Sequence, residues 1–219
     1  MERDRYNKYY IEFHKKRINH LIAFLIKQVK SGSKIGIIGY SIFDPIIRNK
    51  LSACVIYNIL PSREFKLQDG DRSGKVLFYD ITERKSSEIT YEFDCIIFTE
   101  VLEHLFSDDS LVINNVTRLL KKNGLLFFSV PNVSALGKLM SLIKGWNPYM
   151  KKSEIIEGSF GGFGHLREYS FNEVKNLLTG NFKILTLEGW NDYPNIYNGV
   201  AKLLPKIYAE TIFAFCQKL

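Results

Sequence analysis

Short apolar runs that alternate with helical patterns constrain the fold of this chain more than any other feature. Near-continuous apolar runs are typical of parallel strands that are covered on both faces of a sheet. Between the fourth and fifth runs, residues 109–122 have the apolar spacing of a helix, which Ser107 or Asp108 can cap and Gly124 can end. Strands separated by helices predict right-handed crossovers and a largely parallel sheet. The predicted strands are 34–39, 53–59, 75–79, 93–99 and 125–130.

The segments on either side of this alternation carry other patterns. Residues 3–30 have apolar side chains at helical spacing from Ile18 to Val29, which predicts one or two amphipathic helices. A further helical pattern covers 133–144, and Ser170 with Glu173 forms a capping-box pattern at the start of a helix. We interpret the Gly-, Lys- and aromatic-rich stretch 146–165 as a lid or loop insertion. Two final strands are predicted, at 182–187 and 207–216.

Length and composition favour an ordinary globular chain. The 219 residues fit a single domain, 1–219, with a helical extension at 1–32, and 46% of the residues are hydrophobic. The cysteines form no CxxC pair, so we predict buried apolar thiols at Cys54, Cys95 and Cys216 and a reducing, cytoplasmic location. No apolar stretch approaches the roughly 20 residues that span a bilayer, and residues 1–17 are too charged for a signal core. We therefore expect no integral membrane segment.

The formal net charge of +7 permits an anionic partner. RNA, a phosphorylated glycan or a membrane surface would each fit such a charge. The lysines are spread along the chain, so a solvated basic surface is the simpler interpretation. The charge alone therefore selects no partner.

The carboxyl ends of the predicted strands are the expected ligand-binding edge, because ligands of open parallel sheets bind there. The first strand ends at Gly39, which would let the backbone approach a ligand closely. Polar residues follow most of the other apolar runs, including Asn58, Asp80 and Glu100. This pattern is weak by itself, since most strands end in polar residues.

Three segments give a more specific indication when they are taken together. They are 93–105, which contains Glu-Val-Leu-Glu-His, 119–132, which ends in Val-Pro-Asn, and 164–174, which begins Gly-His-Leu-Arg-Glu-Tyr. In order and spacing they resemble the class I S-adenosylmethionine-dependent methyltransferases over roughly 17–187. The resemblance implies a Rossmann-like α/β fold with a mostly parallel seven-stranded sheet, helices on both faces and an antiparallel C-terminal strand. It also implies that S-adenosylmethionine binds at the strand ends, to Gly39, Tyr40, Ser41, Asn58, Asp80, Thr99 and Glu100.

The first two strands depart from the family pattern. Ile37 stands where the family has an acidic residue, and Ser41 and Phe43 stand where it has glycines. Asn58 replaces the acid that binds the ribose hydroxyls, and an amide can still accept one hydrogen bond and donate another. The altered loop favours an alternative hypothesis, a binding or scaffolding protein on the same fold that has lost its cofactor.

A group of carboxylates and imidazoles follows the fourth strand. If the chain is helical there, Glu100, Glu103 and His104 share one face, and His165 could complete a site for Mg²⁺, Mn²⁺ or Zn²⁺. This set resembles the metal ligands of the small-RNA 2′-O-methyltransferases and of the ubiquinone-pathway O-methyltransferases. The alternative interpretation has Glu100 contacting cofactor or substrate, Glu103 on the surface and His104 packed locally.

The resemblance implies methyl transfer to an acceptor, for which we favour an oxygen over nitrogen or carbon. A hydroxyl acceptor needs a base, and the candidates are His104, Glu100 and His165. The acceptor would lie under the lid, where Trp146, Tyr149, Phe160 and Phe163 could line a pocket. A small molecule or a glycan is the favoured acceptor, and RNA stays possible. An NAD-dependent oxidoreductase is disfavoured, because no Gly-x-Gly-x-x-Gly follows the first strand.

Overall fold

The computed structural model describes residues 2–41, 43–62, 74–84, 91–149, 165–191 and 205–219, with backbone alone for 2–10 and 13. Its centre is a seven-stranded sheet in the order β3-β2-β1-β4-β5-β7-β6. Strands β1 to β5 pair in parallel, whereas β7 is antiparallel to both β5 and β6. The predicted fold class is thereby confirmed. The strands are β1 Lys34–Ile38, β2 Val55–Leu60, β3 Lys75–Phe78, β4 Phe93–Thr99, β5 Leu120–Pro131, β6 Phe182–Trp190 and β7 Thr211–Lys218.

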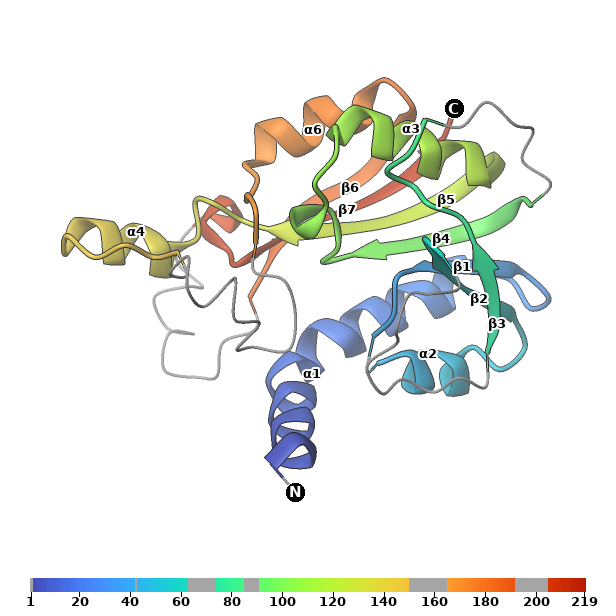
Figure 1. Cartoon of the computed structure of the whole chain (residues 1–219), viewed down its shortest axis with the longest axis horizontal. Helices are drawn as coiled ribbons and strands as arrows, with labels where there is room; N and C mark the ends of the chain where they lie inside the picture. Colours follow the sequence, from blue (N-terminus) through green and yellow to red (C-terminus); the bar gives the residue numbers. More distant parts are fainter. Residues whose placement is uncertain (1, 42, 63–73, 85–90, 150–164, 192–204) are drawn as a thin grey trace.

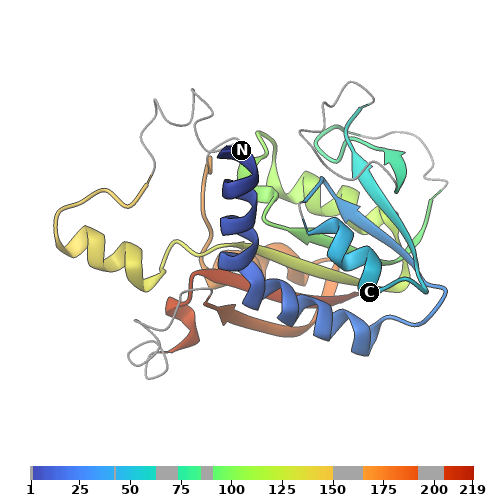
Figure 2. The same cartoon turned by 90° about the horizontal axis from the view of Figure 1, so that it is seen from below.

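The described helices lie mainly on the two faces of this sheet (Figures 1 and 2). Asp108 caps α3 by accepting a hydrogen bond from the Leu111 amide, and Ser170 with Glu173 forms the predicted capping box of α6. The N-terminal pattern is one continuous helix, α1. The described helices are α1 Glu2–Gln28, α2 Asp44–Lys50, α3 Asp109–Leu119, α4 Leu136–Ile143 and α6 Phe171–Thr179, with 3-10 turns η1 Leu102–His104 and η2 Lys206–Tyr208.

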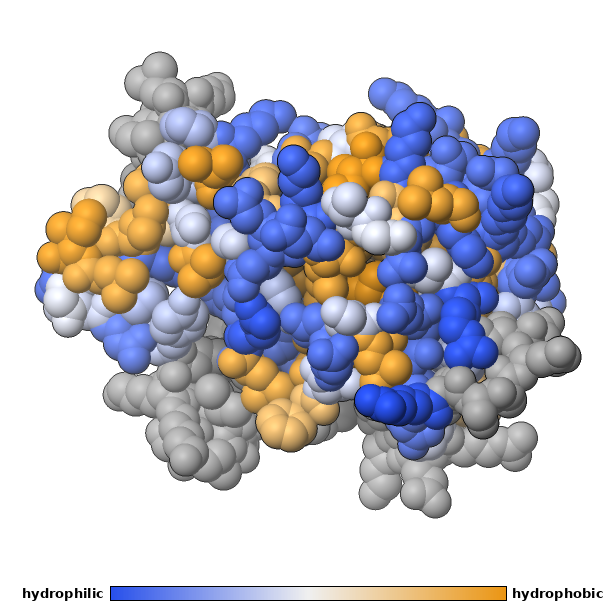
Figure 3. Space-filling model, turned by 90° about the horizontal axis from the view of Figure 1, so that it is seen from above, coloured by the Kyte–Doolittle hydropathy of each residue, from blue (hydrophilic) through white to orange (hydrophobic). Residues whose placement is uncertain are grey.

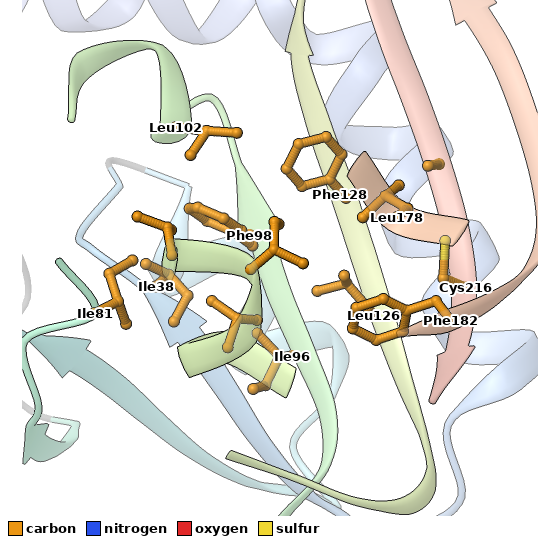
Figure 4. Packing of buried hydrophobic residues seen from close by; sticks show 14 of the residues in the cluster. Ile38, Ile81, Ile96, Phe98, Leu102, Leu126, Phe128, Leu178, Phe182 and Cys216 are labelled. Carbon is orange, nitrogen blue, oxygen red and sulfur yellow. The ribbon is translucent and has the colours of Figure 1, made fainter. Parts of the chain in front are cut away.

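Each face of the sheet has its own apolar core. On one face, α1 and α2 pack over β1 and its neighbours, with Leu25 of α1 fully buried. On the other, α3 and α6 pack over β4 and β5, and Figure 4 shows Phe98, Phe128 and Leu178 in that cluster. Burying a side chain of this size stabilises a fold by roughly 1.5–3 kcal/mol. The continuous apolar runs in the sequence exist because both faces of these strands are covered.

Several boundaries differ from those predicted. Helix α3 ends at Leu119, and β5 begins at Leu120 rather than at residue 125, because the polar residues 121–123 extend the strand beyond its apolar run. Helix α2 was not predicted, since its seven residues bury only Asp44 and Ile47 and show no apolar period. The last strand begins at Thr211, after η2, rather than at residue 207.

Other expectations concern the cysteines, the lid and the membrane. The three cysteines are free thiols, and Cys95 and Cys216 are buried as predicted, whereas Cys54 is partly exposed. Most of the predicted lid, including Phe160 and Phe163, lies outside the described residues. Within the described part of the chain, the helices lack the combination of length and apolarity needed to cross a bilayer.

Candidate functional site

A left-handed glycine turn ends β1 at the carboxyl edge of the sheet. Gly39 has φ +81°, a conformation that residues with a Cβ atom rarely adopt. Its amide donates to the Ile59 carbonyl (2.9 Å), and its own carbonyl accepts from Asn58 Nδ2 (3.0 Å). An added Cβ would meet only Val101 Cγ2, at 3.6 Å, so the glycine is needed for the turn rather than for space.

A pocket of about 150 Å³ lies beside this turn. Four of the predicted cofactor-binding residues line it: Tyr40, Ser41, Thr99 and Glu100. Helix α1 supplies another wall, with Arg17, Ile18 and Leu21. A larger, open depression of about 760 Å³ lies between residues 105–110 and the start of α6, and it shares no lining residue with this pocket. The pocket beside Gly39 is the candidate site, because it alone of these two includes the ends of β1 and β4.

An ion pair forms part of the pocket wall. Arg17 of α1 lies 3.0 Å from Glu100 Oε2, and the other oxygen of Glu100 accepts from the Ser129 hydroxyl (2.7 Å). Glu100 has φ +54°, and its amide donates to the Ser129 carbonyl, so the turn after β4 is fixed against β5. The pair presents one positive and one negative group to the same small pocket.

The side chain of Asn58 is engaged within the protein. It is 1% exposed, and its amide nitrogen donates to the Gly39 carbonyl and to Asp44 Oδ2 (2.7 Å). Its carbonyl oxygen accepts from the guanidinium of Arg48. Asn58 therefore joins the turn after β1 to helix α2, and its predicted role in binding ribose stays a prediction. Asp80 accepts from the amide and hydroxyl of Thr82, and it does not line the pocket.

A second group of polar side chains lies close by, on η1 and at the start of the 165–169 segment. Glu103, His104 and His165 each place a possible ligand atom within 4.8 Å of the others. His104 Nε2 is 3.6 Å from Glu103 Oε1, and the two imidazole rings are 5.2 Å apart. Glu100 is not in this group, because the 3-10 turn begins only at Leu102 and Glu100 turns toward Arg17. The structure thus brings together three of the four predicted metal ligands.

Glu103 is a buried carboxyl group, 1% exposed. Neither of its oxygens has a hydrogen-bond partner among the described residues. Burial raises the pKa of Glu103 well above its usual range, and the negative charge of Glu100 raises it further. The sequence-based alternative that Glu103 lies on the surface is therefore wrong.

Sequence reasoning missed two contributors, Glu168 and Arg17. Glu168 lies 3.1 Å from His165 Nδ1 and also binds Lys138 of α4. Burial would raise the pKa of Glu168, but hydrogen bonds from His165 and Lys138 outweigh it and lower this pKa. The three-residue spacing from His165 was a possible signal for Glu168. No sequence signal identified Arg17, because it is one of several basic residues in its helix and lies 83 positions from Glu100.

The fold and this site define a Rossmann-like α/β protein with a candidate pocket at the carboxyl ends of β1 and β4. The profile of the family described as "Methyltransferase domain" matches residues 37–179. That match covers more than half of the chain and runs from the end of β1 through β5 to the end of α6. The chain therefore belongs to this family, the class I S-adenosylmethionine-dependent methyltransferases.

Solved structures agree with this fold. N-methyltransferase NodS from Bradyrhizobium japonicum WM9, in complex with S-adenosyl-L-homocysteine, has a TM-score of 0.56 at 14% identity, covering 94% of this chain and 87% of that one. An S-adenosylmethionine-dependent methyltransferase from Mesorhizobium loti has a TM-score of 0.57 at 13% identity, covering 89% and 96%. Magnesium protoporphyrin IX methyltransferase from Synechocystis PCC 6803 has a TM-score of 0.54 at 14% identity, covering 94% and 84%. At these identities the likeness shows the fold alone. A search of curated proteins finds no match.

Proposed function

We propose that this protein transfers a methyl group from S-adenosylmethionine to a hydroxyl oxygen of its acceptor. The observation that carries the proposal is the Arg17–Glu100 pair on the wall of the pocket beside Gly39. The amino-acid end of the methyl donor is a zwitterion, with one carboxylate and one ammonium group. Arg17 is complementary to the carboxylate and Glu100 to the ammonium group, so the pocket suits this end of the donor.

The pocket fits only part of the donor. Its volume of about 150 Å³ accommodates the methionine portion, and the adenosine would extend toward the ends of β2 and β3. There Asn58 offers a neutral amide instead of the family's acid, and Asp80 is the nearest carboxylate in the predicted set. Donor affinity in this protein therefore rests mainly on the ion pair and on the glycine turn.

The neighbouring imidazoles suit the acceptor side of the reaction. In the proposed step the acceptor oxygen attacks the methyl carbon, the carbon–sulfur bond breaks, and the sulfonium becomes a neutral thioether. The hydroxyl proton passes to Nε2 of His165. Glu168 fixes that tautomer, because its carboxylate accepts from Nδ1 and leaves Nε2 as the basic nitrogen. His104 is the second candidate base.

Glu103, His104 and His165 are also the residues that would hold a divalent cation. Two imidazoles and a carboxylate suit Mn²⁺ or Zn²⁺ better than Mg²⁺, which prefers oxygen ligands. A bound cation would lower the pKa of a coordinated acceptor hydroxyl. Glu168 would then orient His165 as a ligand through the same hydrogen bond.

For the acceptor, a small molecule or a glycan is the proposed class, with RNA as the alternative. A hydroxyl group beside His165 is the chemical requirement common to all three. The competing proposal, a scaffolding protein without cofactor, keeps the same fold but needs no donor binding. Affinity for S-adenosylhomocysteine, the product formed from the donor, therefore distinguishes the methyltransferase from the scaffolding protein.

Isothermal titration calorimetry with S-adenosylhomocysteine tests the proposal. We expect wild-type protein to bind, and Arg17→Ala to bind about 10- to 100-fold more weakly, since a hydrogen bond to a charged group contributes about 1.5–3 kcal/mol. Lys15→Ala is the matched control, because Lys15 is an exposed cation of the same helix that pairs only locally with Glu12. Wild-type protein that fails to bind at millimolar ligand would support the scaffolding alternative. His165→Gln should leave this affinity unchanged while it lowers the methyl-transfer rate.

A further inference from the structure

Helix α4 projects from the body of the protein instead of covering the sheet. It follows β5 and extends to one side of the molecule (Figures 1 and 2). None of its eight residues is buried. Its start is tied to the candidate site, because Lys138 binds both the Asn132 carbonyl and the carboxylate of Glu168.

The exposed side chains of this projection are mainly apolar and aromatic. Ile143 is 78% exposed and Trp146 is 66% exposed. Figure 3 shows apolar residues gathered at the end of the molecule that α4 occupies. Such a surface is unfavourable in water, so it indicates a contact with something else. The exposed apolar residues, called the α4 patch below, are Met140, Leu142, Ile143, Trp146 and Tyr149.

The charged residues of the segment that carries the α4 patch are all lysines. Residues 133–152 contain no Asp or Glu, and their four lysines are Lys138, Lys144, Lys151 and Lys152. Lys138 is paired with Glu168, whereas the Lys144 ammonium lies over the Trp146 ring, 5.4 Å from its centre. Among the described residues, Glu168 is paired with Lys138 and His165, and Lys144 leaves an ammonium group beside the patch. An apolar surface with an adjacent cation is complementary to a partner that is apolar and anionic.

We propose that the α4 patch docks on the surface of an anionic lipid bilayer. Short helices with an apolar side and flanking lysines lie in the plane of the interface, with the apolar side chains among the upper acyl segments. Trp and Tyr are favoured at that depth because their rings are amphipathic. Lysines are attracted by the negative surface potential of anionic lipids. Since α4 is only eight residues long, the docking is weak and reversible.

Vesicle flotation with the full-length chain tests this proposal. The probes are vesicles of phosphatidylcholine alone and of phosphatidylcholine with phosphatidylglycerol. We expect binding to the anionic vesicles only, and weaker binding at high salt because screening reduces the attraction. Trp146 also serves as a reporter, since Trp190 is only 9% exposed. Its emission should shift to the blue on anionic vesicles, and Trp146→Phe should abolish the shift.

Two matched variants separate docking from general effects. Ile143→Glu should reduce vesicle partitioning by at least about tenfold, because it puts a charge where docking would bury an apolar side chain in the bilayer. Ile26→Glu makes the same change on α1, at a side chain that is 52% exposed. This variant should bind vesicles like wild type. Failure of wild-type protein to bind anionic vesicles, or wild-type binding by Ile143→Glu, would overturn the proposal. So would a dimer in solution that only Ile143→Glu dissociates, which would assign the patch to a second copy.

Discussion

The buried carboxyl of Glu103 makes the stability of this protein depend on pH in a way that one substitution removes. Burial and the charge of Glu100 raise the pKa of Glu103 in the folded state. The folded protein therefore keeps this proton at pH values where the unfolded chain has already lost it. The resulting stabilisation is complete below the unfolded pKa and is lost as the pH rises toward the folded pKa. Glu103→Gln holds a neutral side chain of similar shape and should remove this dependence.

The size of the effect follows from proton linkage. One titrating group changes the free energy of unfolding by at most about 1.4 kcal/mol per pH unit, which gives a limit of about 2.7 kcal/mol between pH 5 and pH 7. That figure is an upper limit for Glu103, whose pKa is raised because its carboxyl group is 1% exposed and lies near the charge of Glu100. The remaining ionisable groups are common to wild type and variant, so the difference between the two proteins reports on Glu103 and its contact with His104.

Urea denaturation at pH 5, 6, 7 and 8, with EDTA present, measures the effect. We expect the stability of Glu103→Gln relative to wild type to increase with pH across this range. Glu92→Gln is the control, because it removes an exposed carboxylate and should follow wild type. Equal pH slopes for wild type and Glu103→Gln would refute the reasoning. If Mn²⁺ binds this carboxylate, replacing EDTA with Mn²⁺ should flatten the wild-type slope, since the metal stabilises the charged form.

Three further substitutions can be measured by the same urea assay. Asn58→Asp introduces the acid that the family has at this position, but it replaces the amide that donates to Asp44 Oδ2 (2.7 Å) with a second carboxylate. We expect the free energy of unfolding to fall by roughly 2 kcal/mol or more at pH 7, and by less in acid. Wild-type stability at pH 7 would contradict this. Gly39→Ala should lose about 1–2 kcal/mol from its positive φ, and a larger loss would reveal a steric clash that the structure does not show. Leu25→Ala should lose about 2–5 kcal/mol because Leu25 is fully buried between α1 and the sheet, and an unchanged midpoint would mean that α1 does not pack there.

The sheet was predictable from sequence because its strands are covered on both faces. The run at 93–99 is apolar at almost every position, since α1 and α2 pack on one side of β4 and α3 and α6 on the other. Helix α2 left no such signal, because it is seven residues long and contacts the core mainly through Ile47. The start of β5 was also not predicted. Leu120 pairs with Phe93 of β4, but the polar residues 121–123 interrupt the apolar pattern before Leu125 pairs with Cys95.

The site was only partly predictable, because spacing along the chain reports local geometry alone. His165 joins Glu103 and His104 across 61 positions, and the resemblance to the family supplied that link. The Arg17–Glu100 pair depends on how α1 crosses the sheet edge, which no local pattern in either segment encodes. The geometry after β4 also differed from the helical expectation, since a positive φ at Glu100 separates it from Glu103.

Two buried polar side chains at the carboxyl edge differ in a way that bears on function. Asn58 is hydrogen bonded on its nitrogen and its oxygen by groups of this chain, so its burial is compensated and it connects the Gly39 turn to α2. Glu103 is equally buried, but its oxygens accept no hydrogen bond from the described residues. A proton, a cation or a substrate can compensate the burial of such a carboxyl group. The Glu103–His165 side is therefore the candidate for the reactive part of the proposed enzyme. On the other side, Ile37, Ser41 and Phe43 line the pocket beside the Gly39 turn.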